Sequence, residues 1–116
     1  MNSVLKKINR INGVKGSLLV NREGMIVVSE VPEGIDENGI SALASTIYIN
    51  LESALKRLNF GVPNRLTISG EKGRILLFRI EDELVLTVIT RKDINMGLLK
   101  VELKDAAEEL LGKLRK

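Results

Sequence analysis

The chain has 116 residues, of which 18 are Lys or Arg and 15 are Asp or Glu, giving a formal net charge of +3. It contains no cysteine and no histidine, which excludes disulfides and thiolate metal sites and removes the commonest general base and zinc ligand. A chain of this length fits one domain, spanning 1–116, that can bury a substantial core.

Neither a membrane nor a nucleic acid is indicated as a partner. No apolar run approaches the ~20 residues needed to cross a bilayer, and Lys6 and Lys7 interrupt the N-terminus before an apolar signal-peptide core could form. The basic residues are scattered among acidic ones, and one Tyr, two Phe and no Trp leave almost no surface for stacking on bases. We therefore expect a cytoplasmic domain that neither spans a membrane nor binds nucleic acid.

The N-terminal part predicts a helix followed by a hairpin. The helix covers about 3–12, with Ser3 as its N-cap. Two short β-type segments follow at 16–20 and 25–29, and the turn-forming residues 21–24 lie between them. These two segments are expected to pair as antiparallel neighbours.

The longest helical pattern covers 36–58, and Asp36 is positioned to cap its start. One face forms an apolar stripe that predicts contact with the core: Ile40, Leu43, Ala44, Ile47, Leu51, Ala54, Leu55 and Leu58. The opposite face carries small or apolar side chains, namely Ala42, Ser45, Ile49 and Ser53. Since 28% of the chain is charged, a solvated face would normally show Glu and Lys. We interpret this face as a partner-binding surface, most simply for a second copy, with a neutral exposed face as the alternative.

Three further strands and a helix are predicted after the central helix. Segment 65–69 alternates apolar and polar residues, which is typical of a strand with one buried face, and we place it at an edge. Segments 75–80 and 84–90 are apolar on both faces, so they are expected at the centre of a sheet covered on both sides. The last helix covers 96–114, with Asn95 as its N-cap.

The predicted order is helix–strand–strand–helix–strand–strand–strand–helix (α-β-β-α-β-β-β-α). Two doubly buried strands and three amphipathic helices favour an α/β (α+β) architecture, a three-layer helix–sheet–helix sandwich around one antiparallel sheet. Leu98 and Val101 point away from the apolar face of the last helix, and nothing in their spacing indicates what covers them.

The element order and its joints resemble the roadblock family of dynein light chains and their bacterial and archaeal relatives. The resemblance spans about 3–114. It rests on the combination of sequence features at three connections between the predicted elements. The residues that carry it are Ile11-Asn12-Gly13-Val14-Lys15-Gly16-Ser17-Leu18-Leu19-Val20, Arg22-Glu23-Gly24, Asn95-Met96-Gly97-Leu98, Glu102-Leu103 and Ala106-Ala107.

This resemblance implies a profilin-like, roadblock-type fold with one five-stranded antiparallel sheet. The central helix would lie on one side of the sheet and the two terminal helices on the other. It also implies dimers joined through the central helix and the third strand, which adds Leu66, Thr67 and Ile68 to the proposed interface. Family members act as adaptors in motor complexes or as regulators of small Ras-like GTPases, including activators of GTP hydrolysis. The resemblance carries over no catalytic, cofactor-binding or metal-binding residue.

Four other features resemble functional sites, and a structural explanation is favoured for each. Segment 70–73 has the glycines of a phosphate nest, but it joins two strands and lacks the phosphate-loop pattern, which indicates a hairpin turn. The consecutive carboxylates at 81–83 cannot converge on one cation from a tight turn. Glu71 and Glu81 would act as a hydrolytic pair only if the fold joined them. Arg22 resembles a finger for a GTPase site, although turn arginines are usually solvated.

These observations predict a non-catalytic, dimeric regulatory module that binds a small Ras-like GTPase and modulates its GTP hydrolysis or localisation. A structural adaptor without nucleotide dependence is the alternative. A small-ligand sensor is the third class, and the leucine- and valine-filled strands favour a packed core over the pocket that a sensor needs. No cofactor is expected.

Overall fold

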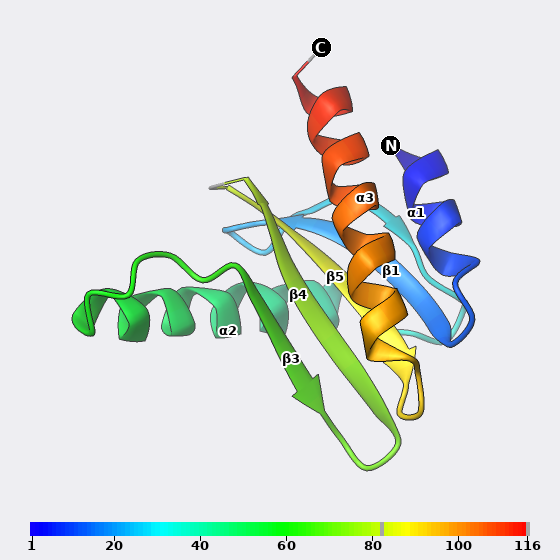
Figure 1. The fold of residues 1–116 in the computed structure, drawn as a ribbon, viewed down its shortest axis with the longest axis horizontal. Coiled ribbons are helices and arrows are strands. Elements are labelled where there is room, and N and C mark those ends of the chain that lie inside the picture. The colour runs from blue at the N-terminus through cyan, green and yellow to red at the C-terminus, as the bar shows by residue number, and fades with distance from the viewer. Residues whose placement is uncertain (82, 116) are drawn as a thin grey trace.

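The computed structural model describes residues 1–81 and 83–115. Eight elements follow one another in this part of the chain, in the predicted order (Figure 1). They are α1 (Asn2–Asn9), β1 (Val14–Asn21), β2 (Ile26–Glu30), α2 (Glu37–Arg57), β3 (Arg65–Ser69), β4 (Gly73–Glu81), β5 (Leu84–Arg91) and α3 (Met96–Leu114). The type of each element was predicted correctly, and the ends differ by a few residues.

Two of the three helix starts are capped as predicted. The carboxylate of Asp36 accepts a hydrogen bond from the Gly39 amide (3.0 Å) at the start of α2. The amide oxygen of Asn95 accepts one from the Leu98 amide (3.0 Å) at the start of α3. Each side chain satisfies one of the donors that the first helical turn leaves free.

The predicted cap and length of α1 are wrong. No side chain caps this helix, and the Ser3 hydroxyl instead accepts a hydrogen bond from Lys113 Nζ (3.1 Å) in α3. The helix ends at Asn9, whose Nδ2 donates to the Glu30 carbonyl (2.8 Å) and whose Oδ1 accepts from the Ser17 hydroxyl (2.8 Å). Contacts with distant elements, absent from the local sequence pattern, therefore decide where α1 ends.

The five strands form one antiparallel sheet in the order β2-β1-β5-β4-β3. The sequence placed segments 75–80 and 84–90 inside the sheet and segment 65–69 at its edge, and all three placements are confirmed. The long-range β1–β5 pairing joins the N-terminal hairpin to the C-terminal meander, and it places Leu19 opposite Leu86.

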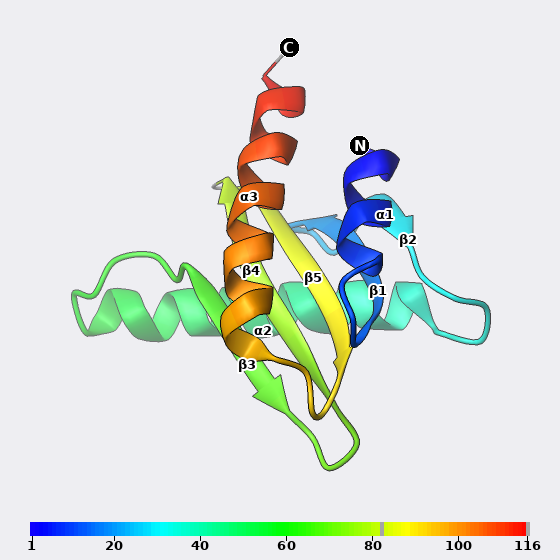
Figure 2. The same ribbon diagram turned by 45° about the vertical axis from the view of Figure 1, so that its right-hand side comes forward.

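The helices cover the two faces of the sheet unequally. Figures 1 and 2 show α1 and α3 side by side on one face and α2 crossing the other, as the resemblance implied. The larger core cluster lies under α1 and α3 and includes Leu5, Leu86, Leu99 and Leu103. The smaller cluster lies under α2 and consists of Ala44, Tyr48, Leu77 and Val85. The C-terminal half of α2 projects beyond the sheet in both views.

Candidate protein-interaction surface

The buried side of α2 carries mostly small or polar side chains, and Tyr48 is its one large aromatic residue. Its buried residues are Ser41, Ala44, Ser45, Tyr48 and Glu52. The apolar stripe predicted to face the core is therefore rotated toward solvent. Ala44 is buried as predicted. The prediction is wrong for Ala54, which is exposed, and for Leu43 and Leu58, which are 63% and 59% exposed. Small side chains let α2 approach the rest of the chain closely. Which residues of α2 are buried is therefore not decided by how apolar their side chains are.

The β1–β2 turn explains this close approach. Gly24, with φ +85°, lies so near α2 that a Cβ atom on it would sit 3.5 Å from the Ala42 backbone. The Ser45 hydroxyl donates a hydrogen bond to the Arg22 carbonyl in the same turn. Ser45 was predicted to face a partner, and the structure corrects this placement, because its side chain is buried within its own monomer.

An ion pair also links this turn to α2. Arg22 Nη1 donates to Glu52 Oε2 (2.9 Å) and Nη2 to Oε1 (2.7 Å), a two-pronged geometry that strengthens such pairs. Only 8% of the Glu52 side chain is exposed. The hydrogen bonds from Arg22 lower the pKa of the Glu52 carboxyl below its ordinary value, against the opposing effect of burial. Because the Arg22 guanidinium is held within its own chain, it is not presented as a finger for another protein.

The remaining predicted residues of α2 are exposed. Ala42, Ile49 and Ser53 lie on the solvent side of the helix, and Ile49 and Ser53 line an open hollow together with Lys56. The most exposed large apolar side chain of α2 is Leu43, on the stripe predicted to face the core. Three large apolar residues continue this exposed surface past the end of α2: Leu58, Phe60 and Val62.

The β3 strand offers a second exposed surface beside α2. Leu66 is half-buried against the cluster under α2, together with Ile47 and Ile75. Ile68 lies on the same face and lines an apolar hollow of about 320 Å³. Thr67 alternates to the opposite face and is exposed.

The backbone of β3 is open along its outer edge. The Gly70 amide donates to the Gly73 carbonyl (2.8 Å), and the Arg79 amide to the Asn64 carbonyl (2.9 Å). Since hydrogen-bonded positions alternate along an antiparallel pair, even-numbered residues of β3 bond to β4. The amide and carbonyl groups of Arg65, Thr67 and Ser69 therefore point away from the sheet. An edge of this kind can pair with another strand.

The other candidate sites are structural. Segment 70–73 is a hairpin turn between β3 and β4, as predicted. Glu71 precedes β4 and Glu81 ends it, so the fold does not bring these carboxylates together. Asp82, in the predicted acidic turn, lies outside the described residues. Within the described part of the chain, no group of three His, Cys, Asp or Glu residues could hold a metal ion, and no helix is long and apolar enough to cross a membrane.

Comparison with known proteins identifies the family. The sequence model of the Roadblock/LC7 domain matches residues 1–90, from α1 to nearly the end of β5. The chain belongs to the Roadblock/LC7 domain family. Two relatives from Methanocaldococcus jannaschii, the uncharacterized proteins MJ1340 and MJ0310, are 31% and 30% identical to this Roadblock/LC7 chain over 107 residues. In both cases the match covers 92% of this chain and 93% of the relative.

Solved structures share the Roadblock/LC7 fold of this chain along its whole length. Myxococcus xanthus MglB superposes with a TM-score of 0.93 at 20% identity, covering 98% of this chain and 94% of MglB. A Roadblock/LC7 domain from Streptomyces avermitilis superposes with a TM-score of 0.92 at 14% identity, covering 100% and 98%. The fold therefore includes α3, which lies beyond the residues that the family model matches.

Proposed function

We propose that this Roadblock/LC7 chain is a non-catalytic, dimeric regulatory module that binds a small Ras-like GTPase in the cytoplasm. The observation that carries the proposal is the exposed apolar side of α2 beside the open edge of β3. Both features lie in a chain whose family includes GTPase regulators. Exposed aliphatic side chains and an unpaired strand edge together favour association with another protein.

A second copy of the chain is the first partner in this proposal. The copies would pair along β3 and bury the side of α2 that carries Leu43, with Ala42, Ile49 and Ser53 at its flank. A two-fold arrangement lets the same surface serve both copies. It also covers the half-buried Leu66 and Ile68.

Hydrogen exchange tests the pairing of β3. In the dimer we expect slow exchange at the amides of Arg65, Thr67 and Ser69, because these donors point outward and would bond to the second copy. Thr67→Pro should abolish dimerisation while sparing the β3–β4 ladder, because it removes an outward donor. Leu66→Pro is the contrasting variant, since it removes a donor to β4. Fast exchange at Thr67 in a wild-type dimer would place the interface elsewhere.

Binding to the GTPase is tested by purification followed by calorimetry. The chain is used to capture proteins from its native lysate with either GDP or a GTP analogue added, and any captured GTPase is then titrated in both nucleotide states. We expect tighter binding to the GTP-loaded form, with a coupling free energy of ~1–3 kcal/mol. A turnover assay then shows whether the chain changes GTP hydrolysis by ordering the partner's switch loops.

The outcomes separate the two leading functions. Capture of a GTPase that binds this chain equally tightly in its GDP-loaded and GTP-loaded forms would favour a structural adaptor. Capture of no GTPase would reject the regulatory proposal. A small-ligand sensor has less support, because Leu77, Leu86 and Val88 fill the space between the sheet and the helices.

A further inference from the structure

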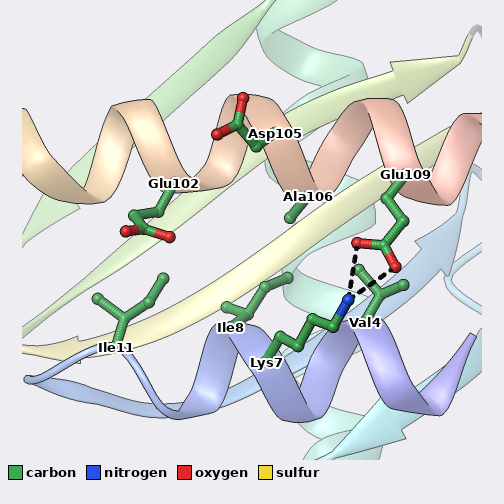
Figure 3. A pocket seen from close by; sticks show the side chains of 8 residues that line it. All are labelled: Val4, Lys7, Ile8, Ile11, Glu102, Asp105, Ala106 and Glu109. Atoms are coloured by element: carbon green, nitrogen blue, oxygen red, sulfur yellow. Dashed lines mark hydrogen bonds and ion pairs between the residues drawn. The ribbon is translucent and has the colours of Figure 1, made fainter.

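A groove runs between α1 and α3 on the face of the sheet opposite to α2 (Figure 3). Its floor is apolar and includes Ile8, Ile11 and Ala106. Its volume is about 110 Å³, of the same order as the ~150 Å³ cavity that loss of a buried aliphatic side chain can leave. The groove can therefore accept one aliphatic side chain from outside.

The rim of this groove is acidic. Glu102, Asp105 and Glu109 of α3 line it, and Lys7 of α1 is the only cation among its lining residues. Figure 3 shows Lys7 reaching across to Glu109, with Nζ 3.1 Å from the nearer carboxylate oxygen. Within the described chain, Glu102 and Asp105 have no hydrogen-bond or ion-pair partner for their side chains. A chain of net charge +3 thus carries a local excess of negative charge here.

Exposed apolar residues extend the groove past the end of α1. Leu98, Glu102, Asp105 and Glu109 recur every three or four residues, so they share one side of α3. Leu98 and Val101 are 52% and 63% exposed. The helices are antiparallel, since Lys113 bonds to Ser3 at one end while Ile11 and Glu102 line the other. The surface is therefore apolar at the start of α3 and acidic further along it.

We propose that the α1–α3 groove binds a basic amphipathic helix of a partner protein. Aliphatic residues of this helix would cover Leu98 and Val101 and enter the groove, and its Lys or Arg residues would pair with Glu102 and Asp105. The stretch from Leu98 to Glu109 is about 17 Å long, which matches a segment of about eleven helical residues. Charge complementarity and an aliphatic anchor are the features by which such grooves recognise helices.

This site is independent of the proposed dimer and GTPase contacts. The groove lies in the α1–α3 layer, whereas α2 covers the opposite face of the sheet (Figure 2). A dimer formed through α2 and β3 would leave both of its grooves open. Each protomer can then hold one basic helix whether or not a GTPase is bound.

The probe is a fluorescein-labelled peptide of about twelve residues, with leucines at one end of a helical face and lysines along the remainder. Anisotropy measures its binding to the full chain, and ¹⁵N shifts locate it. We expect the largest shifts at Ile8, Ile11 and Ala106, with little change at Thr67. A second peptide with glutamate in place of lysine should not bind.

Two matched variants test the acidic rim. Glu102→Lys reverses a charge that lines the groove, and Glu33→Lys makes the same change at an exposed position in the loop between β2 and α2, outside the groove. We expect Glu102→Lys to weaken binding roughly tenfold and Glu33→Lys by less than about twofold. Circular dichroism confirms that both exposed substitutions leave the fold intact.

Three results would overturn the inference. The first is absence of peptide binding at hundreds of micromolar at low salt. The second is equal weakening by Glu102→Lys and Glu33→Lys, which would indicate non-specific attraction between charges. The third is a set of shifts centred on α2 or β3. All three results would leave the GTPase proposal standing, because that proposal depends on other surfaces.

Discussion

Leu43→Glu is expected to convert the proposed dimer into a folded monomer. Leu43 is 63% exposed in the isolated chain, so a carboxylate there remains solvated and the monomer keeps its core. In the proposed dimer the same carboxylate would be buried without a partner, at a cost of several kcal/mol. The dissociation constant should rise by roughly 10²- to 10³-fold.

Light scattering over a dilution series measures this change. Val101→Glu is the matched control, because Val101 is equally exposed, at 63%, but lies on α3 in the opposite layer. It should leave the dimer unchanged. Ile49→Glu shows whether the interface reaches the side of α2 near the β1–β2 turn. A wild-type monomer at tens of micromolar, or a dimeric Leu43→Glu variant, contradicts the proposed interface.

Arg22→Ala is expected to destabilise the fold by about 1–3 kcal/mol, because it leaves the Glu52 carboxylate largely buried without its main partner. Lys56 Nζ, 3.9 Å from Glu52 and well exposed, compensates little. Chemical denaturation in the Leu43→Glu background measures the effect without a contribution from dimer dissociation.

Two further variants show whether the loss comes from the unpaired carboxylate. The double variant Arg22→Met/Glu52→Leu should regain much of the stability, because neither charge remains. Lys7→Ala removes an exposed ion pair and should change stability by less than ~1 kcal/mol. An Arg22→Ala variant as stable as its parent would show that the pair contributes nothing to the fold.

The same pair predicts a pH dependence of definite sign. Because Arg22 lowers the pKa of the Glu52 carboxyl in the folded state, the unfolded chain binds a proton at higher pH than the folded chain does. The stabilisation is therefore complete above the ordinary value of 4.5 and is lost as the pH falls through the lowered pKa. The difference in unfolding free energy between the parent and Arg22→Ala should shrink below pH 4.5. A difference that stays constant or grows there would contradict the assignment.

The order of elements was readable from the sequence because local chemistry decides it. Apolar runs on both faces marked two of the three inner strands, β4 and β5, and the alternation in 65–69 marked β3, one of the two edge strands. The inner position of β1 was not predicted. Asp36 and Asn95 marked the two long helices because a short polar side chain bonds to an amide only three residues away.

The face of α2 that contacts the sheet was decided by tertiary structure. Helical periodicity ranked the faces by apolarity and placed Leu43 inside and Ser45 outside, whereas the fold does the opposite. The deciding contacts come from the β1–β2 turn, where Gly24 allows close approach and Arg22 pairs with a glutamate 30 residues away. One signal was present, since Glu52 is the first charged residue of α2 after Glu37, but its partner Arg22 cannot be identified without the fold.

The α1–α3 groove depends on tertiary structure even more than the orientation of α2 does. The sequence revealed that Leu98 and Val101 point away from the apolar face of the last helix. It could not reveal the groove, because Lys7 and Glu109 meet across a separation of 102 residues. Periodicity reports which residues share a face of one helix, and only the packing of two helices determines what lies opposite that face.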